Sequence, residues 1–270
     1  MRKNRLRQIW AEGRPALNGW LSIGSPFCAE IMAAQDYDAL CIDIQHGALD
    51  YGDALAMLQA MRASDAVPLV RVPWLDAAWI SKVLDAGAYG VICPMINTRA
   101  EAEAFVRFMR YPPLGERSYG PTRAAYAAGA NYAAEANDEI LALAMIETAE
   151  AMENLEAIAA TPGLDGLYVG PADLSLSLSQ GALTPGFDRE EPEIVAAIRR
   201  IAEACRLNGI KAGIHCGTPD YAARAIGWGF DLTTVSGDAR LIAAAAAGSV
   251  ARWRRLTEPT AAEAGAPEGY

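Results

Sequence analysis

The stretch that decides the fold is Leu141-Ala-Leu-Ala-Met-Ile-Glu147-Thr148, followed one helix-length segment later by Leu164-Asp-Gly-Leu-Tyr-Val-Gly-Pro-Ala-Asp173. Each is a short apolar run, typical of a buried strand, and each closes on an acidic residue. The interval between Glu147 and Asp173 fits one strand-helix-strand step, which predicts that both carboxylates lie on the same rim of a parallel sheet. An acidic group at the end of a buried strand is costly unless a cation meets it. The pair therefore suggests a divalent metal.

Similar apolar runs alternate with amphipathic segments of helix length along the rest of the chain. Helical patterns cover residues 50–63 and 190–207, and Gly, Asp or Pro marks the turns. Eight strand-helix units predict an α/β fold of the (β/α)8 TIM-barrel type, although periodicity alone also allows an open doubly wound sheet. No GxGxxG follows the first strand, which argues against dinucleotide binding. The expected strands are 17–22, 39–43, 67–72, 90–94, 141–147, 165–170, 211–216 and 231–236.

Length and composition predict one domain and exclude several functions. A chain of 270 residues with 52% hydrophobic composition can bury one large core, so we expect a single barrel domain over residues 1–256 and a flexible tail over 257–270. The formal charge of −10 argues against nucleic acid or an anionic membrane as a partner. An anionic substrate would then need a local basic pocket.

Cysteine usage and the N-terminus point to the cytoplasm. The five cysteines are an odd number without CxxC spacing, which indicates reduced thiols. The basic N-terminus is not followed by the apolar core of a signal peptide. No segment reaches the roughly 18 uninterrupted apolar residues that a membrane span needs.

In a barrel, the chemistry lies at the carboxyl ends of the strands, so reading those ends in order gives the candidate site. The ends are unusually polar for strand termini. They comprise Trp20, Ser22, Asp43, Gln45, His46, Arg71, Pro94, Glu147, Gly170, Pro171, Ala172, Asp173, His215, Ser236 and Asp238.

The motifs at these ends together resemble the HpcH/HpaI aldolase family of class II pyruvate aldolases. The resemblance covers roughly residues 15–255, and it rests on the order and spacing of the motifs, since any one alone is weak. The motifs are Gly-Trp20-Leu, Ile-Asp43-Ile-Gln-His46-Gly, Val-Arg71-Val-Pro, Leu-Asp85-Ala-Gly, Pro94-Met, Arg110-Tyr-Pro-Pro-Leu-Gly-Glu-Arg, Ile-Glu147-Thr and Gly170-Pro-Ala-Asp173-Leu-Ser.

The resemblance implies Mg²⁺, Mn²⁺ or Co²⁺ held by Glu147 and Asp173, without an organic cofactor. Two carboxylates without a cysteine or histidine cluster also favour such oxygen-preferring ions. The alternative is that the carboxylates cap neighbouring helices, as Asp173 could do for the helix from Leu174. The resemblance also implies that Trp20 and the Gly170-Pro171-Ala172 segment bind substrate, with backbone amides at a helix start meeting the ketoacid carboxylate.

Three further residues have catalytic roles by resemblance. Arg71 would bind the oxygen of the enolate that forms when pyruvate loses a methyl proton, whereas its alternative role is an ion pair with Glu147 or Asp43. His46 would form a dyad with Asp85 that orients the imidazole and relays the proton. Without the family pattern, a lone histidine such as His46 is more often structural.

The chain departs from the family pattern at three positions. His215 stands where relatives often have an apolar residue lining the aldehyde pocket, so it could select polar acceptors or bond to Ser236 or Asp238. Gln45 replaces a common Glu and Met145 a common Gln. Both, with Asp43, are expected near the metal, so the placement of water there is open.

We therefore expect a reversible aldol reaction between a small 2-ketoacid, pyruvate or hydroxypyruvate, and an aldehyde. None of the lysines closes a strand that faces the pocket, so no Schiff base is expected. The enzymatic alternative is a carbon–carbon lyase for acyl-CoA thioesters, which would need a basic groove. A catalytically silent barrel used for binding is the other alternative.

Two segments suggest assembly. Residues 111–138 are too long for an ordinary connection and form either a functional or interface loop or a surface excursion. The last helix, roughly 238–255, has a small apolar surface that is broad for one barrel face. The resemblance implies that this helix is swapped between neighbours in a hexamer, although its alanines could also pack on their own barrel.

Overall fold

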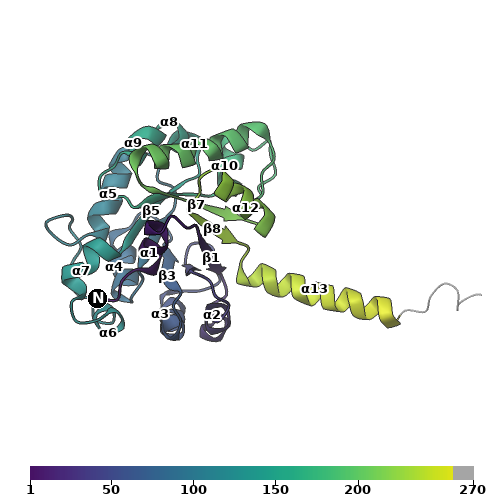
Figure 1. Ribbon diagram of the computed structural model, residues 1–270, viewed down its shortest axis with the longest axis horizontal. Coiled ribbons are helices and arrows are strands. Elements are labelled where there is room, and N and C mark those ends of the chain that lie inside the picture. The colour runs from purple at the N-terminus through teal and green to yellow at the C-terminus, as the bar shows by residue number, and fades with distance from the viewer. Residues whose placement is uncertain (258–270) are drawn as a thin grey trace, which may run out of the picture.

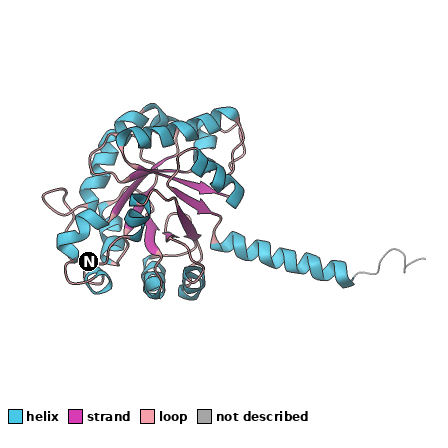
Figure 2. Cartoon of the chain, viewed as in Figure 1, coloured by secondary structure: helices cyan, strands magenta, loops and turns pink. Residues whose placement is uncertain are grey.

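The protein is a closed barrel of eight parallel strands surrounded by helices (Figures 1 and 2). The structure, a computed structural model, describes residues 1–257. The strands pair in sequence order, and the barrel closes where Ala16 on the first strand pairs with Leu232 on the last. This closure confirms the predicted TIM barrel and excludes the open sheet. The predicted tail lies outside the described residues, except for Thr257.

Each predicted strand is present, with its ends shifted by one residue or less. Nearly all strand positions are buried, because helices cover the outside and side chains fill the inside of the barrel. The strands are β1 (Ala16–Leu21), β2 (Ala39–Asp43), β3 (Val67–Arg71), β4 (Gly90–Cys93), β5 (Leu141–Ile146), β6 (Gly166–Val169), β7 (Lys211–Cys216) and β8 (Leu232–Val235).

The helices begin at side-chain caps in many places. Asp50 and Thr98 form capping boxes, and Ser25 and Thr218 accept hydrogen bonds from first-turn amides. The helices are α1 (Arg5–Ala11), α2 (Pro26–Ala33), α3 (Tyr51–Ala60) with the short η1 (Met61–Ala63), α4 (Ala77–Asp85), α5 (Arg99–Met109), α6 (Ala124–Ala128), α7 (Tyr132–Glu139), α8 (Ala149–Glu153), α9 (Leu155–Ala159), α10 (Pro171–Leu178), α11 (Pro192–Asn208), α12 (Pro219–Gly227) and α13 (Asp238–Thr257).

Helix α1 covers the end of the barrel where the strands begin. Arg7 donates hydrogen bonds to the carbonyl of Ile140 and to Asp165, which precede β5 and β6. The indole of Trp10 donates to the carbonyl of Asp231, just before β8. These bonds close the amino-terminal end, so the cavity described below can open only at the carboxyl ends of the strands.

The last helix leaves the barrel at the carboxyl ends and extends away from it (Figure 1). Asp238 fixes the first turn of α13, because its buried carboxylate accepts hydrogen bonds from the amide and hydroxyl of Ser22 and from the amide of Ile23. From residue 239 to 257 every side chain is exposed in the single chain. The helix was predicted from the sequence, and its packing on the chain's own barrel is not observed.

The predicted long loop over residues 111–138 is only partly a loop. Its alanine-rich second half forms α6 and α7, since alanine has the highest helix propensity. In the first half, Arg117 is buried between the rings of Tyr111 and Tyr132 and donates a hydrogen bond of 2.7 Å to Asp85. Burial of this arginine holds the base of the loop against α4 and α7.

The described residues include no helix that is long and apolar enough to cross a membrane. All five cysteines are free thiols, as the sequence suggested. Four of them are buried, and Cys28 is partly buried.

Candidate active site

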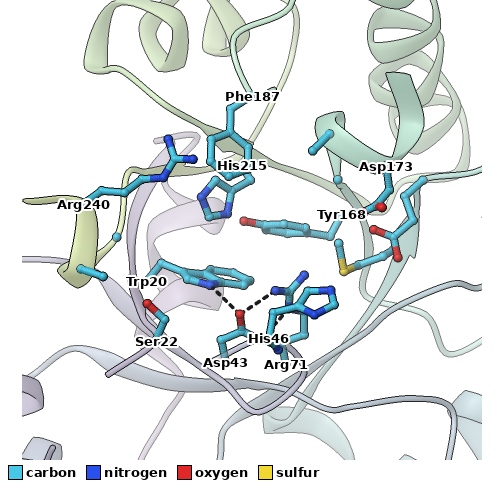
Figure 3. A pocket seen from close by; sticks show the side chains of 16 residues that line it. Trp20, Ser22, Asp43, His46, Arg71, Tyr168, Asp173, Phe187, His215 and Arg240 are labelled. Atoms are coloured by element: carbon cyan, nitrogen blue, oxygen red, sulfur yellow. Dashed lines mark hydrogen bonds and ion pairs between the residues drawn. The ribbon is translucent and has the colours of Figure 1, made fainter. Parts of the chain in front are cut away.

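A cavity of about 360 Å³ opens at the carboxyl ends of the strands (Figure 3). It gathers most of the site residues expected from the sequence on one rim. Those that line it are Trp20, Asp43, His46, Arg71, Met145, Glu147, Gly170, Ala172, Asp173 and His215, joined by Ser22, Tyr168, Phe187, Gly237, Ala239 and Arg240. Pro171, Gln45 and Asp85 are not among the lining residues.

Glu147 and Asp173 line the same end of this cavity: Oε2 of Glu147 lies beside Gly170, and Figure 3 shows Asp173 on the side away from Arg240. Glu147 follows β5 and is 2% exposed, and its Oε1 accepts a 2.8 Å hydrogen bond from the amide of Met95. Met95 has a left-handed backbone with φ of 55°, which is rare for a residue with a side chain and therefore marks a constrained position. Asp173 lies in the first turn of α10, and its side chain makes no hydrogen bond within residues 1–257. The helix cap considered for Asp173 is not formed.

Glu147 lies where the protein provides little compensating positive charge. Burial raises the pKa of the Glu147 carboxyl to about 7, the charge of Asp173 acts in the same direction, and the Met95 amide and Arg71 only partly oppose them. A buried carboxylate beside a second carboxylate therefore needs more positive charge than the protein supplies.

Gly170 leaves space for the carboxylate of Glu147. A Cβ at position 170 would overlap with Oε2 of Glu147 and would lie 3.0 Å from Cε of Met145. Oε2 therefore occupies the space that a side chain at 170 would fill. The same residue precedes Pro171, the first residue of α10, so the glycine both admits Glu147 and starts the helix.

The donor set fits a hard divalent cation. Within the described residues no group of three or more His, Cys, Asp or Glu could hold a metal, so the protein would supply the two carboxylates and leave the other positions to water and substrate. The uncompensated charge at Glu147 is the observation that favours such an ion. The amides of Ala172 and Asp173, which have no partner in the first turn of α10, lie beside this end of the cavity.

Asp43 and Arg71 form a two-point ion pair on the cavity wall. Arg71 Nε donates to Oδ1 of Asp43 at 2.9 Å and Nη2 to Oδ2 at 2.6 Å. Asp43 also accepts bonds from the indole of Trp20 and from the amides of Gln45 and His46. Although burial alone would raise the pKa of Asp43, the hydrogen bonds and charge of Arg71 lower it. The ion pair between Arg71 and Asp43, considered from the sequence as an alternative role of Arg71, is thus formed.

This ion pair fixes Arg71 without using all of its donors. Its guanidinium carbon lies 4.9 Å from the centre of the Trp20 ring, and its Nη1 makes no hydrogen bond within the described part of the chain. The side chain is 11% exposed and lines the cavity. Nη1 is therefore a positioned donor available to a ligand.

His46 and Asp85 are not brought together in one chain. His46 follows β2 at the carboxyl ends, whereas Asp85 is the last residue of α4, and a helix of a barrel runs back toward the amino-terminal end. The strands between the two ends are roughly 15 Å long. One oxygen of Asp85 accepts the Arg117 hydrogen bond, and the carboxylate is 25% exposed. A dyad between the two residues therefore requires a second copy of the chain.

His215 lies in an aromatic stack at the other end of the cavity. The Phe187 ring stacks on it at 4.4 Å between centres, and the Trp20 ring meets it edge-on at 4.8 Å (Figure 3). Burial, with help from the charge of Arg71, lowers the pKa of His215 to about 3, so the imidazole is neutral at pH 7. The expected alternative of a bond to Ser236 or Asp238 is not found in the described residues.

The sequence did not mark Phe187, Tyr168 or Arg240 as site residues. Phe187 lies in an irregular segment without periodicity, and Tyr168 is an interior position of β6 whose hydroxyl bonds to Thr234 at 2.6 Å. Arg240 follows the end of β8, and this position was the one feature of the sequence that could have marked it as a site residue. The buried Oε1 of Gln45 has no hydrogen-bond partner in the described residues. It is therefore an acceptor to which a water molecule near the site could donate.

The amino-acid sequence matches a known family. The sequence model of HpcH/HpaI aldolase/citrate lyase matches residues 18–244. The chain belongs to this family. The resemblance drawn from its motifs is therefore confirmed.

Relatives of the family with assigned names are similar over almost the whole chain. A hydroxypyruvate/pyruvate aldolase of Rhizorhabdus wittichii is 43% identical over 94% of this chain and 100% of its own length. A 4-hydroxy-2-oxovalerate aldolase of Rhodococcus jostii is 35% identical over 94% of this chain and 97% of its own length. A family member from Burkholderia cenocepacia of known crystal structure has a TM-score of 0.86 and 33% identity, covering 93% of this chain and 100% of that chain.

The space that Gly170 provides for Glu147 gives a first test. Gly170→Ala is expected to keep the fold, because Glu147 has a flexible end that can move, but to displace that carboxylate and weaken Mn²⁺ binding by roughly 10- to 100-fold. Calorimetric Mn²⁺ titration with circular dichroism checks this. Gly227→Ala, at an exposed glycine with open space, is the control. Equal Mn²⁺ affinity in the two variants would contradict this role.

The raised pKa of Glu147 predicts how the chelated protein responds to pH. Its contribution to stability is complete below the unfolded pKa of about 4.5 and is lost as pH rises through about 7. In EDTA, Glu147→Gln should therefore raise the free energy of unfolding at pH 8 by on the order of 3 kcal/mol, and much less at pH 5. Urea unfolding at both pH values checks this, with exposed Glu193→Gln as the control. A gain equal at both pH values would contradict the assignment.

Proposed function

We propose that this carbon–carbon lyase is a class II, divalent-metal-dependent aldolase that joins pyruvate or hydroxypyruvate to an aldehyde and cleaves the product in reverse. The observation that carries the proposal is the paired carboxylates Glu147 and Asp173 facing the same cavity as the unused donor of Arg71. The names of the relatives from R. wittichii and R. jostii support the same reaction class.

We assign the ketoacid to the end of the cavity formed by Glu147 and Asp173. A divalent cation held there, Mg²⁺, Mn²⁺ or Co²⁺, would polarise the carbonyl of the ketoacid and make its methyl or methylene protons more acidic. The amides at the start of α10, around Gly170 and Ala172, would hold the ketoacid carboxylate, since helix N-termini favour anions. Loss of a proton from this bound ketoacid gives an enolate.

Arg71 would stabilise the negative charge that develops on the enolate oxygen. Its ion pair with Asp43 holds the guanidinium in one orientation before substrate arrives, so little reorganisation is needed during the reaction. Nη1 remains as the donor for that oxygen. Asp43 is therefore a positioning residue for Arg71, and Trp20 supports both through its indole bond and its ring.

His46 would take and return the proton. We infer that its dyad with Asp85 forms between neighbouring subunits, because the two residues lie at opposite ends of one barrel. The Oδ2 oxygen of Asp85 makes no hydrogen bond in the described chain. The Arg117 bond to Oδ1 orients the carboxylate and partly opposes burial, which raises the pKa of Asp85. His46 is exposed in the single chain and so is accessible to a partner.

The two other chemistries considered from the sequence have less support. Lys3, Lys82 and Lys211 do not line the cavity, so a Schiff base with the ketoacid has no candidate amine there. The acyl-CoA lyase alternative draws on solved structures named as citrate lyases. The likeness to one of them from Burkholderia xenovorans, at 19% identity, shows the fold alone.

We further propose that a second copy covers α13 and that the assembly is a hexamer with this helix swapped between neighbours. Beyond its first turn the helix is not buried against its own barrel. Four large apolar side chains are therefore 52–75% exposed in the single chain, namely Ile242, Val250, Trp253 and Leu256. The loop held by Arg117 carries another exposed apolar side chain, Tyr119, which is 74% exposed. Such surfaces are typical of subunit interfaces.

The enolate role of Arg71 predicts a specific loss. Arg71→Lys should reduce exchange of the pyruvate methyl protons in D₂O by roughly 10²- to 10³-fold, because an ammonium group cannot bond both oxygens of Asp43 and still offer a third positioned donor. Proton NMR measures this exchange without an aldehyde. Arg206→Lys, on the exposed face of α11, is the control. Wild-type exchange in Arg71→Lys would rule out the proposed role.

The assembly predicts a light-scattering mass of about six times the 28.7 kDa chain. A chain ending after residue 241 should keep the Asp238 anchor, remain folded and give a smaller assembly. A mass of one chain for the full-length protein would overturn the proposal. So would an unchanged hexamer after truncation.

A further inference from the structure

The end of the cavity away from Glu147 and Asp173 has an aromatic wall with one cation. Phe187 stacks on His215, and the guanidinium carbon of Arg240 lies 4.6 Å from the centre of the Phe187 ring (Figure 3). All three side chains line the cavity, together with Trp20. Arg240 lies in the first turn of α13, and His215 at the end of β7, so the wall is built from separate elements.

Hydrogen bonds fix the segment that carries Phe187 directly after this residue. Asp188 accepts hydrogen bonds of 2.6 Å from the amide of Gly217 and 2.7 Å from the hydroxyl of Thr218, which follow β7. The carbonyl of Arg189 accepts a bond from the hydroxyl of buried Tyr221. Phe187 is therefore held over His215 by bonds on its C-terminal side rather than by packing in a core.

Arg240 has no acidic partner among residues 1–257. The nearest acid along the helix, Asp238, is occupied by Ser22, Ile23 and its own helix start. The imidazole of His215 is neutral and therefore adds no positive charge beside the guanidinium. Arg240 thus offers five N–H donors at the mouth of a cavity in a chain of net charge −10.

The two arginines of the cavity differ in their acidic partners, which suggests different roles. Arg71 is committed to Asp43 and lies toward the carboxylate pair, so it belongs with the ketoacid. Arg240 lies beyond the aromatic wall, where a second substrate would extend from the reacting carbon. A planar guanidinium held on a ring can bind a carboxylate or phosphate with two parallel bonds.

We propose that Arg240 is a specificity-determining residue that binds an anionic group at the far end of the acceptor aldehyde, with Phe187 as the platform that holds its guanidinium. The inference rests on the aldolase function proposed above. It narrows the acceptor class to aldehydes that carry a carboxylate or a phosphate. His215 and Trp20 would contact the carbon chain between the aldehyde and the anion.

The test compares each anionic acceptor with a neutral one of matching carbon chain, with glyceraldehyde as the neutral match for glyceraldehyde 3-phosphate. Succinic semialdehyde carries a carboxylate, butanal replaces it by a methyl group, and glyceraldehyde 3-phosphate carries a phosphate. The kcat/KM for each is measured with pyruvate in the full-length enzyme and in Arg240→Gln. The ratio of anionic to neutral acceptor should fall by roughly 10- to 100-fold in Arg240→Gln and be partly kept in Arg240→Lys. Arg206→Gln, an exposed arginine outside the cavity, should keep the ratio.

The outcomes separate this inference from the function on which it rests. A ratio that falls for the carboxylate or for the phosphate supports it and identifies the anion. An unchanged ratio for both anions, with butanal still converted, overturns the role of Arg240 and leaves the aldolase intact. If no aldehyde is converted by the wild-type enzyme, while its fold and metal binding are normal, the proposed function itself fails.

Discussion

The site depends on one electrostatic constraint, which is that Glu147 is buried without a cation of its own. The basic group that could have compensated it, Arg71, has two of its donor nitrogens bound to Asp43. The second nearby acid, Asp173, adds repulsion. A buried carboxylate in this setting is unfavourable without a nearby positive charge, so the divalent cation that we propose would relieve a cost that the protein alone leaves unpaid. Gly170 makes room for the carboxylate that creates this constraint.

In the proposed function, the same arrangement divides the cavity into a ketoacid end and an acceptor end. At the first end lie the carboxylates, the amides of α10 and Nη1 of Arg71. At the second lie the aromatic stack of Phe187, His215 and Trp20, with Arg240 at the mouth. Trp20 belongs to both, because it bonds Asp43 and contacts His215. On this proposal, different residues on one rim carry out the chemistry and choose the acceptor, as barrel enzymes allow.

Much of this site could be predicted because strand ends in a barrel meet on one rim. The apolar runs that end at Glu147 and near Asp173 are enough to place two carboxylates together. The position of Asp85 was also accessible in principle, because a residue that ends a helix lies at the opposite end of the barrel from one that ends a strand. Phe187 was not predictable, since it lies in an irregular segment whose course is set by the side-chain bonds of Asp188 and by the Arg189 carbonyl. What covers the exposed side chains of α13 could not be predicted either, because the periodicity of one chain does not show which surface another copy would contact.

The most direct test of the account is pyruvate release from a 4-hydroxy-2-ketoacid, followed with coupled lactate dehydrogenase before and after chelation. The account predicts that EDTA abolishes release, that Mg²⁺, Mn²⁺ or Co²⁺ restores it, and that Glu147→Gln and Asp173→Asn stay inactive when metal is restored although both remain folded. Turnover at the wild-type rate in fully chelated enzyme, with no divalent ion detectable in the protein, would contradict it.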